Sequence, residues 1–326
     1  MNFHALKIGV IGTTSWGTTL ALHLAKLGHE VYLWARSPEE AQQLRRDGEN
    51  RRFLPGIPFT GSLHVTPEEG LLRDAAMTIF AVPSKTLRLN VNRFKPHLTT
   101  ATTIVSATKG LEMTTGFRMS QVLYEELPSE FESQICVLSG PNLSAEIARG
   151  LPASTVIASK NAALAQQAQR AFVSPQLRVY TNSDVIGVEL GGSLKNIVAL
   201  GAGIVDGLEL GNNSKSAFIT RGLVEITRLG VAAGANPITF SGLAGLGDLI
   251  ATTASPLSRN RYVGEQLAHG RALQDIESTM HNVAEGVGTT VAALKLAADL
   301  GIEMPITETT YKVLFEDLTP QSALVE

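Results

Sequence analysis

Short apolar runs recur through the first half of the chain, and polar or helix-forming segments separate them. Apolar runs of about 4–8 residues bounded by turn residues are typical of buried strands. The predicted strands are Ile8–Ile11, Val31–Trp34, Met77–Val82, Thr103–Ala107, Ile135–Leu138, Ser154–Ala158 and Leu177–Tyr180. The predicted helices between them include Thr18–Lys26, Lys85–Arg93 and Ala162–Phe172. Because strands and helices alternate, this half is predicted to form a doubly wound α/β sheet.

A different pattern begins near Asp184, where helical periodicity becomes dominant and strand-like runs become scarce. The predicted helices are Val188–Asp206, Ser214–Ala233, Arg261–His269, Thr289–Leu300 and Thr307–Glu316. A chain of 326 residues is long enough for two domains. We therefore predict an α/β fold with an N-terminal Rossmann-type domain over residues 1–183 and an all-helical C-terminal domain over residues 184–326.

A glycine-rich turn, Gly12 to Gly17, joins the first predicted strand to the first predicted helix. Such a turn presents backbone N–H groups at a helix N-terminus, where the pyrophosphate of a dinucleotide can bind. The motif G-x-G-x-x-G is incomplete, because Thr14 replaces its second glycine. By itself the turn is equally consistent with an ordinary strand–helix connection. We expect the Thr14 side chain to weaken cofactor binding relative to glycine.

The second predicted strand ends without the acidic residue that usually binds the ribose of NAD. Arg36 follows the strand instead. A guanidinium group there suits the 2′-phosphate of NADPH or stacking on adenine, which slightly favours NADPH over NADH. The alternative is a surface arginine, since Ser37 to Glu40 is a good helix start. Asn50 to Pro58 is predicted to be a basic loop.

Composition places the chain among soluble globular proteins, with 44% hydrophobic and 17% charged residues. The net charge of −3 does not favour nucleic acid as a partner. The single cysteine, Cys136, excludes an intrachain disulfide framework and is consistent with a reducing compartment. No run approaches the roughly 20 apolar residues of a membrane span, and the first residues do not form a targeting segment. We expect a cytoplasmic protein.

The sequence also argues against two classes of site. The seven histidines lack metal-binding spacing, and the motifs H-E-x-x-H and C-x-x-C are absent, so no metal site is predicted. Gly-x-Ser-x-Gly is absent as well, which argues against a serine hydrolase of the nucleophile-elbow type.

Several polar residues occupy positions suited to catalysis. Lys109 and the segment Gly140 to Asn142 follow predicted strands, and ligands of doubly wound sheets bind beyond the carboxyl ends of strands. Lys195 lies in an otherwise apolar helix, where burial and a second cation such as Lys109 would lower its pKa. Such a lysine can exchange a proton with a substrate oxygen, whereas the alternative is a lysine that reaches the helix surface.

Two segments of the second half could bind a substrate. Asp248 ends the glycine-rich segment Gly242 to Asp248 and could accept hydrogen bonds from substrate hydroxyls or hold Lys195; close helix packing is the alternative explanation of the glycines. Ser258, Arg259 and Asn260 begin a predicted helix and could bind a phosphate group of a small substrate. A solvated helix start explains the second segment equally well.

Taken together, these segments resemble bacterial-type NAD(P)-dependent glycerol-3-phosphate dehydrogenases. The matching stretches, which cover nearly the whole chain in order, are SWGTTLA (15–21), LWAR (33–36), NRRFLPGI (50–57), AVPS (81–84), ATKGLE (107–112), LSGPN (138–142), ELGGSLKNI (189–197), GLAGLGDL (242–249), SRNR (258–261) and VAEGVGT (283–289). The resemblance implies a dinucleotide-binding Rossmann domain, a helical substrate-binding domain, and reversible reduction of dihydroxyacetone phosphate to sn-glycerol 3-phosphate.

The resemblance also implies roles for individual residues. Lys195 matches the catalytic lysine. The substrate positions are Lys109, Gly140, Asn142, Lys195, Asp248, Ser258, Arg259 and Asn260. The NAD or NADP positions are Ser15, Trp16, Arg36, Phe53, Lys109, Ser144, Arg259, Val283 and Glu285, and the glycine turn adds Gly12 and Gly17. The family further implies a homodimer.

This chain departs from the family at three positions. Thr14 replaces the second glycine, Asn142 stands where serine or threonine is more frequent, and Ser144 stands where alanine is frequent.

Two other functions stay open from the sequence. A β-hydroxyacid dehydrogenase also combines a Rossmann domain with a lysine-bearing helical domain, but would need a carboxylate site at Ser258 to Asn260. A nucleotide-sensing or scaffold protein would have lost activity through Thr14.

Overall fold

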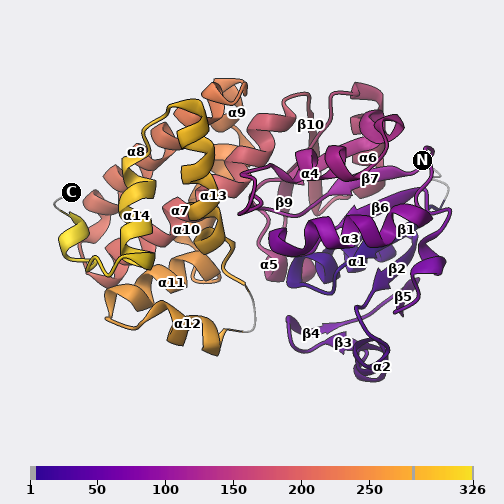
Figure 1. Ribbon diagram of the computed structural model, residues 1–326. Coiled ribbons are helices and arrows are strands. Elements are labelled where there is room, and N and C mark those ends of the chain that lie inside the picture. Colours follow the sequence, from indigo (N-terminus) through magenta and orange to yellow (C-terminus); the bar gives the residue numbers. More distant parts are fainter. Residues whose placement is uncertain (1–4, 281–282, 325–326) are drawn as a thin grey trace. The chain divides into compact units, whose positions relative to one another are not determined.

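The computed structural model describes residues 5–280 and 283–324, which form two compact units (Figure 1). The second unit contains the chain from Asp184 onward and also two earlier segments, Lys109–Met119 and Ser139–Pro141. The first unit contains the remaining residues. Both short segments precede the predicted division at residue 184. Residues 1–4, 281–282 and 325–326 of the predicted domains lie outside the described part.

The first unit is built on an eight-stranded sheet with the order β10-β9-β8-β7-β6-β1-β2-β5. Its strands are β1 (Lys7–Ile11), β2 (Glu30–Trp34), β5 (Leu63–Thr66), β6 (Met77–Phe80), β7 (Thr103–Ser106), β8 (Ile135–Ser139), β9 (Ala153–Ala158) and β10 (Leu177–Asn182). β1 pairs in parallel with both β2 and β6. The pairs β2–β5, β6–β7, β7–β8 and β9–β10 are also parallel. The strand order reverses beside β1, which is where doubly wound sheets bind ligands.

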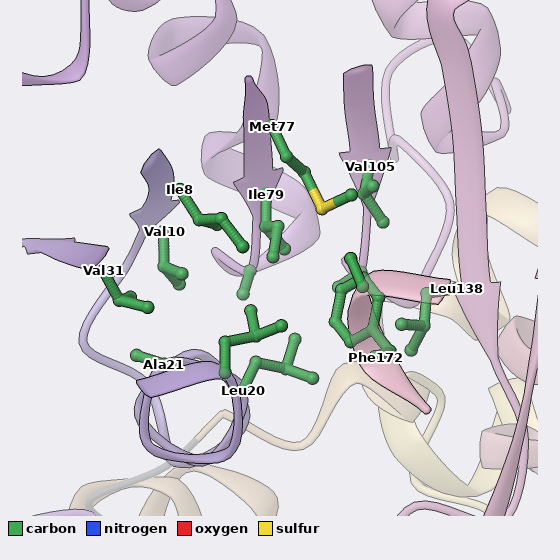
Figure 2. Packing of buried hydrophobic residues seen from close by; sticks show 14 of the residues in the cluster. Ile8, Val10, Leu20, Ala21, Val31, Met77, Ile79, Val105, Leu138 and Phe172 are labelled. Carbon is green, nitrogen blue, oxygen red and sulfur yellow. The ribbon is translucent and has the colours of Figure 1, made fainter. Parts of the chain in front are cut away.

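Helices cover both faces of this sheet because its strands are apolar on both sides. Its α-helices are α1 (Ser15–Lys26), α2 (Pro38–Asp47), α3 (Leu87–Phe94), α4 (Met119–Glu126), α5 (Ser144–Ala148) and α6 (Ala162–Phe172). On one face, Leu20 of α1 packs against Ile8 and Val10 of β1 in a core that also contains Phe172 of α6 (Figure 2). On the other face, Phe94 of α3 meets the ring of Trp34 edge-on at a centroid distance of 5.0 Å.

The region after α2 differs from the prediction. Residues 50–58, predicted to be a basic loop, form most of a small antiparallel pair, β3 (Glu49–Asn50) and β4 (Leu54–Pro58). The edge strand β5 was not predicted either. The predicted helix Lys85–Arg93 starts as a 3₁₀ turn over Ser84–Thr86 before α3.

The second unit is helical in its larger part and is organised around α7 (Val185–Gly207). The other helices are α8 (Gly211–Ala232), α9 (Pro237–Phe240), α10 (Asp248–Ala254), α11 (Arg259–Ala268), α12 (Leu273–Thr279), α13 (Glu285–Leu300) and α14 (Pro305–Phe315). A π-helical turn over Leu243–Gly247 precedes α10. Within the described ranges, α7 is the one helix that is long and apolar enough to cross a membrane, but 94% of its apolar stretch is buried inside the protein. It therefore has the character of a core helix.

Glycine allows α7 and α11 to pack with their backbones almost in contact. A Cβ atom on Gly203 of α7 would lie 2.0 Å from the carbonyl oxygen of Arg261, and one on Gly264 of α11 would lie 1.9 Å from the carbonyl oxygen of Leu200. Side chains at these positions would force the helices apart. The close crossing fixes the start of α11 relative to the middle of α7, where Lys195 lies.

Candidate active site

Three segments of the second unit bring two lysines to one carboxylate. Lys195 of α7 donates through Nζ to Asp248 Oδ1 and to Thr252 Oγ1, both on α10. Lys109 donates to the other carboxylate oxygen, Asp248 Oδ2, at 2.6 Å and to the carbonyl oxygen of Gly140 at 2.9 Å. Lys109, Gly140, Lys195 and Asp248 were all predicted site residues, and the structure places them together.

Burial gives this cluster unusual acid–base properties. Lys195 is 6% exposed and Asp248 is 1% exposed. Loss of solvation lowers the pKa of Lys195 to about 7, an effect that Asp248 opposes and that the cations of Lys109 and Arg259 reinforce. An amine with a pKa near 7 can act as an acid or as a base at neutral pH. The Lys195 ammonium is therefore suited to exchanging a proton with a bound oxygen atom.

Ser193 fixes the backbone next to Lys109. Its Oγ accepts from the N–H of Gly110 at 3.0 Å and donates to the carbonyl oxygen of Gly110 at 3.1 Å. Gly110 has a φ of +136°, a conformation that a side chain would disfavour. Farther along the same segment, Arg118 forms an ion pair with Glu189 of α7. These contacts hold Lys109–Met119 on the helical unit and set where the Lys109 ammonium lies.

Thr252 and Ser193 are polar contacts of this cluster that sequence reasoning missed. Thr252 follows Asp248 by one helical turn, so the i, i+4 spacing could have indicated that both face Lys195. Its hydroxyl donates to the carbonyl oxygen of Asp248 at 2.7 Å, which leaves a lone pair for the lysine. Ser193 precedes Lys195 by two residues, and nothing in the sequence links it to Gly110.

The predicted phosphate segment lies at the start of α11. Ser258 is the N-cap, and its Oγ accepts from the N–H of Arg261 at 3.2 Å. Arg259 donates through Nη1 to the carbonyl oxygen of Val283 at 2.7 Å, and Glu285 lies close enough to act on its charge. The structure thus brings together three predicted cofactor residues, Arg259, Val283 and Glu285.

Asn260 connects this segment to the lysine cluster. Its Nδ2 donates to Oδ1 of Asn196, the residue after Lys195, at 2.9 Å. Its Oδ1 accepts from the N–H of Gly286 at 2.9 Å. Because both ends of the Asn260 amide are engaged, its geometry is fixed from two helices.

Asn142 and Ser144 belong to the first unit, separately from Gly140. The Asn142 amide is held by β9, where it donates to the carbonyl oxygen of Ser154 at 3.3 Å and accepts from Thr155 Oγ1 at 2.9 Å. Ser144 begins α5, and its carbonyl oxygen accepts from Thr19 of α1 at 3.2 Å. Both contacts of the Asn142 amide thus lie within the first unit.

The glycine turn of the first unit has the geometry of a dinucleotide-binding turn. Gly12 has a φ of +114°, and a Cβ atom there would lie 2.8 Å from the carbonyl oxygen of Ala81, just beyond β6. A Cβ atom on Gly17 would lie 2.0 Å from the carbonyl oxygen of Gly12. Both glycines are needed for the close approach of α1 to β1 and β6. The turn therefore lies where the strand order reverses, as a dinucleotide site requires.

Thr14 has a structural role that the sequence did not reveal. It is the N-cap of α1, and its Oγ1 accepts from the N–H of Gly17 at 3.0 Å. The same hydroxyl donates to the carbonyl oxygen of Ala81 at 2.8 Å. The side chain is thus directed at the protein's own backbone on both sides of the turn.

Other predicted cofactor residues surround this turn in the first unit. Ser15 donates through Oγ to the carbonyl oxygen of Phe53 at 2.8 Å, which ties the β3–β4 pair to α1. The indole nitrogen of Trp16 is buried without a hydrogen-bond partner in the described part of the chain. Arg36 has a 73% exposed side chain and lies 3.5 Å from the Glu40 carboxylate. The tight glycine contacts and the unpaired Trp16 donor fit a bound dinucleotide.

Within residues 5–280 and 283–324, no group of three or more His, Cys, Asp or Glu side chains is arranged so that it could hold a metal ion. Cys136 is buried, and burial raises the pKa of its thiol to about 12. A thiol in that environment stays protonated and packs as a core residue.

Comparison with known proteins agrees with this geometry in both halves of the chain. Residues 7–165 match the family described as NAD-dependent glycerol-3-phosphate dehydrogenase N-terminus, and residues 184–325 match the corresponding C-terminus. A protein of Dehalococcoides mccartyi named glycerol-3-phosphate dehydrogenase [NAD(P)+] is 52% identical over 319 residues, covering 97% of this chain and 89% of that one. A protein of the same name from Chlorobium phaeobacteroides is 48% identical over 325 residues, covering 98% and 97%.

Solved structures agree as well. The crystal structure of glycerol-3-phosphate dehydrogenase from Coxiella burnetii has a TM-score of 0.93 and 37% identity, and the match covers 98% of both chains. A ketopantoate reductase structure from Ralstonia eutropha, at 16% identity and a TM-score of 0.62, shares the fold alone. The two family matches together cover most of the sequence, and the relatives match it along nearly its whole length. The chain belongs to the NAD-dependent glycerol-3-phosphate dehydrogenase family.

Proposed function

We propose that the chain catalyses the reversible NAD(P)H-dependent reduction of dihydroxyacetone phosphate to sn-glycerol 3-phosphate, which supplies the backbone of glycerophospholipids. The observation that carries this proposal is the buried cluster of Lys195, Asp248 and Lys109. It holds one lysine with a pKa of about 7 against a carboxylate and a second cation. A ketone that becomes an alcohol needs such a proton donor at its oxygen.

In this mechanism the nicotinamide, when bound, supplies a hydride to C2 of the ketone or accepts one from the alcohol. Lys195 Nζ donates its proton to the C2 oxygen during reduction and takes it back during oxidation. Asp248 orients the Lys195 amine through Oδ1, and Lys109 keeps the carboxylate in place through Oδ2. Thr252 accepts from Lys195, so the amine retains a fixed direction as its charge changes.

The remaining predicted residues would bind substrate and cofactor. Ser258, Arg259 and Asn260 at the start of α11 would hold the phosphate of the substrate, since guanidinium, hydroxyl and amide groups all donate to phosphate oxygens. Gly140 and Asn142 would contact the rest of the substrate. The residues proposed to hold the cofactor are Gly12, Ser15, Trp16, Gly17, Arg36, Phe53, Lys109, Ser144, Arg259, Val283 and Glu285.

In this scheme residues 1–183 supply the dinucleotide-binding domain and residues 184–326 the substrate-binding domain, to which the earlier segments Lys109–Met119 and Ser139–Pro141 also belong. We further propose that the protein is a homodimer, as the family resemblance implies, and that it is cytoplasmic, as the sequence pattern predicts. Light scattering of the purified protein would test the dimer.

The lysine mechanism is tested by replacing Lys195 with alanine. Loss of a positioned proton donor should lower the rate of NADH oxidation by dihydroxyacetone phosphate about 10²–10⁴-fold. NADH binding, followed by nicotinamide fluorescence, should persist. Lys160→Ala serves as a control because this lysine is exposed in the first unit. Turnover close to the unmodified protein's in Lys195→Ala would contradict the mechanism.

The pH dependence of the unmodified protein adds a second readout. Reduction needs protonated Lys195, so the rate of reduction should fall above a pH of about 7. Oxidation needs the neutral amine, so the rate of oxidation should rise through the same range.

The identity of the substrate is tested separately, with dihydroxyacetone without phosphate and a short β-hydroxy acid as the comparison substrates. If the β-hydroxy acid is used better than sn-glycerol 3-phosphate, the proposed substrate is wrong.

A further inference from the structure

The carboxylate of Glu40 lies where the adenosine ribose of a dinucleotide would be expected. Glu40 Oε1 accepts from Thr13 Oγ1, in the glycine turn, at 2.8 Å. Glu40 Oε2 accepts from the N–H of Arg36, just beyond β2, at 3.2 Å. One side chain from α2 thus connects the glycine turn to the end of β2. These are the two elements that flank the ribose in a Rossmann-type fold.

The end of β2 itself carries no acidic residue. The position of the Glu40 carboxylate beside the end of β2 is therefore significant. In NAD-binding folds an Asp or Glu about 20 residues after the glycine motif accepts hydrogen bonds from the ribose hydroxyls. Here β2 ends at Trp34 and is followed by Ala35 and Arg36. Glu40 lies farther along the chain, but the first turn of α2 brings its carboxylate back to Arg36.

Several contacts fix this carboxylate while leaving it accessible. Ser37 caps α2 and accepts from the N–H of Glu40 at 3.2 Å. Thr13 is held from the other side, because Asn50 Nδ2 donates to its carbonyl oxygen at 2.8 Å. The Glu40 side chain nevertheless remains 22% exposed. A ligand can therefore reach a carboxylate whose direction is already set.

Arg36 is coupled to the same group. Its guanidinium Nε lies 3.5 Å from Glu40 Oε2, so the carboxylate offsets the positive charge that a 2′-phosphate would need. Ribose hydroxyls could donate to Glu40, whereas a 2′-phosphate next to Glu40 would place two anions together. A capping box would pair the Glu40 side chain with the N–H of Ser37, so helix capping does not explain the bond to Thr13.

We propose that Glu40 takes the place of the missing acid at the end of β2 and makes this chain prefer NADH over NADPH. The inference rests on the proposed function, because it specifies which of the two cofactors the same site binds. It reverses the slight preference for NADPH that Arg36 suggested in the sequence.

Glu40→Gln tests this by removing the charge while keeping the shape and the hydrogen-bond acceptor. The Gln side-chain oxygen can still accept from the N–H of Arg36. We expect the ratio of the dissociation constants for NADPH and NADH to fall about tenfold, which corresponds to about 1.4 kcal/mol. The matched control is Glu39→Gln, which removes a charge from the same turn of α2. Glu39 is exposed and bonds with Ser37. The ratio of the two dissociation constants in Glu39→Gln should therefore equal that of the unmodified protein.

Fluorescence titration of the full chain with NADH and with NADPH, without substrate, gives both constants independently of activity. Tighter binding of NADH by the unmodified protein and a selective gain in NADPH affinity in Glu40→Gln would support the proposal. Preference of the unmodified protein for NADPH, an unchanged ratio in Glu40→Gln, or equal weakening of both cofactors would overturn it. If neither cofactor binds the unmodified protein, the proposed function itself fails.

Discussion

The Thr14 hydroxyl occupies a backbone N–H group of the glycine turn. It accepts from the N–H of Gly17 and donates to the carbonyl oxygen of Ala81, so it caps α1 and ties the glycine turn to β6. The N–H of Gly17 would otherwise be one of the free donors that a pyrophosphate can use. The cap of α1 and a bound pyrophosphate would therefore use the same backbone group, the N–H of Gly17.

Thr14→Gly should accordingly strengthen cofactor binding and weaken the fold. We expect the dissociation constant for NADH to fall, because the N–H of Gly17 becomes available and the side chain is removed. The lost cap and the lost bond to Ala81 should cost about 1 kcal/mol of unfolding free energy. Fluorescence titration and thermal denaturation measure the two effects. Thr14→Ser keeps the hydroxyl and is the control; an unchanged or larger dissociation constant in Thr14→Gly would disprove the competition.

The residues of the lysine cluster were partly predictable from the sequence. Lys195 was indicated because a cation in an apolar helix needs a partner. Asp248 was predicted as a possible partner, and Lys109 as a second cation that would lower the pKa of Lys195. Their convergence on one carboxylate was not predictable, because it depends on the fold that brings residues 109, 195 and 248 together. Asn142 was grouped with Gly140 by its sequence position, but its amide is held by β9 in the first unit.

At the scale of elements, the buried strands were the most predictable feature. Ile8–Ile11 and Val31–Trp34 each differ from the observed strand by one residue at one end, and helix Ala162–Phe172 matches at both ends. The two strand predictions rest on short apolar runs bounded by turn residues, which are typical of buried strands and too short for a helix. Strand β4 was missed because its five residues include Pro55, Gly56 and Pro58, which disfavour strands. Contacts with the glycine turn, such as Ser15 to Phe53, hold that segment instead.

Two histidines connect the region of α1 to the C-terminal end of α6. His23 Nε2 lies 2.7 Å from the carbonyl oxygen of Phe172. His29 Nε2 lies 3.1 Å from the carbonyl oxygen of Ala171, while its Nδ1 accepts from the N–H of Leu6 at 3.2 Å. Only the neutral ring of His29, with its proton on Nε2, satisfies both contacts. Protonation of His29 would place an N–H donor at Nδ1 against the N–H of Leu6.

The stability of the first unit should therefore fall in mild acid. Burial lowers the pKa of both histidines below the ordinary value of 6.5. The unfolded chain then binds more protons in this range, so stability is present above pH 6.5 and is lost as the pH falls from there toward the folded-state pKa values. Each kcal/mol lost lowers the Tm of a domain of this size by about 2–4 °C.

Thermal denaturation between pH 7.5 and 5.5 would measure this loss. His23→Gln keeps a donor for Phe172 and should make the Tm less dependent on pH. His269→Gln is the control, because His269 is exposed at the end of α11. An equal pH dependence in His23→Gln and in the unmodified protein would exclude His23 as a cause.

At the scale of the whole molecule, the chain does not divide into two continuous halves. The second unit takes Lys109–Met119 and Ser139–Pro141 from within the sequence of the first. The change of pattern near Asp184 shows where the helical region begins, but no sequence pattern indicates that the two short segments belong to it. Side-chain contacts attach Lys109–Met119 to the helical unit. Arg118 forms an ion pair with Glu189, and Leu111 is 1% exposed in the helical core.

A fragment of residues 184–326 should consequently fold poorly. It lacks Lys109, Leu111 and Arg118, so the buried carboxylates of Asp248 and Glu189 each lose a cationic partner. Removing one partner of a buried ion pair costs about 3–5 kcal/mol, a large part of the stability of a domain. We expect a thermal transition that is broad, or well below that of the full chain. Adding a peptide of residues 109–119 should raise the midpoint, whereas the same peptide with Leu111 and Arg118 replaced by alanine should not. Cooperative unfolding of the fragment at the temperature of the full chain would show that the two short segments contribute little to the helical unit.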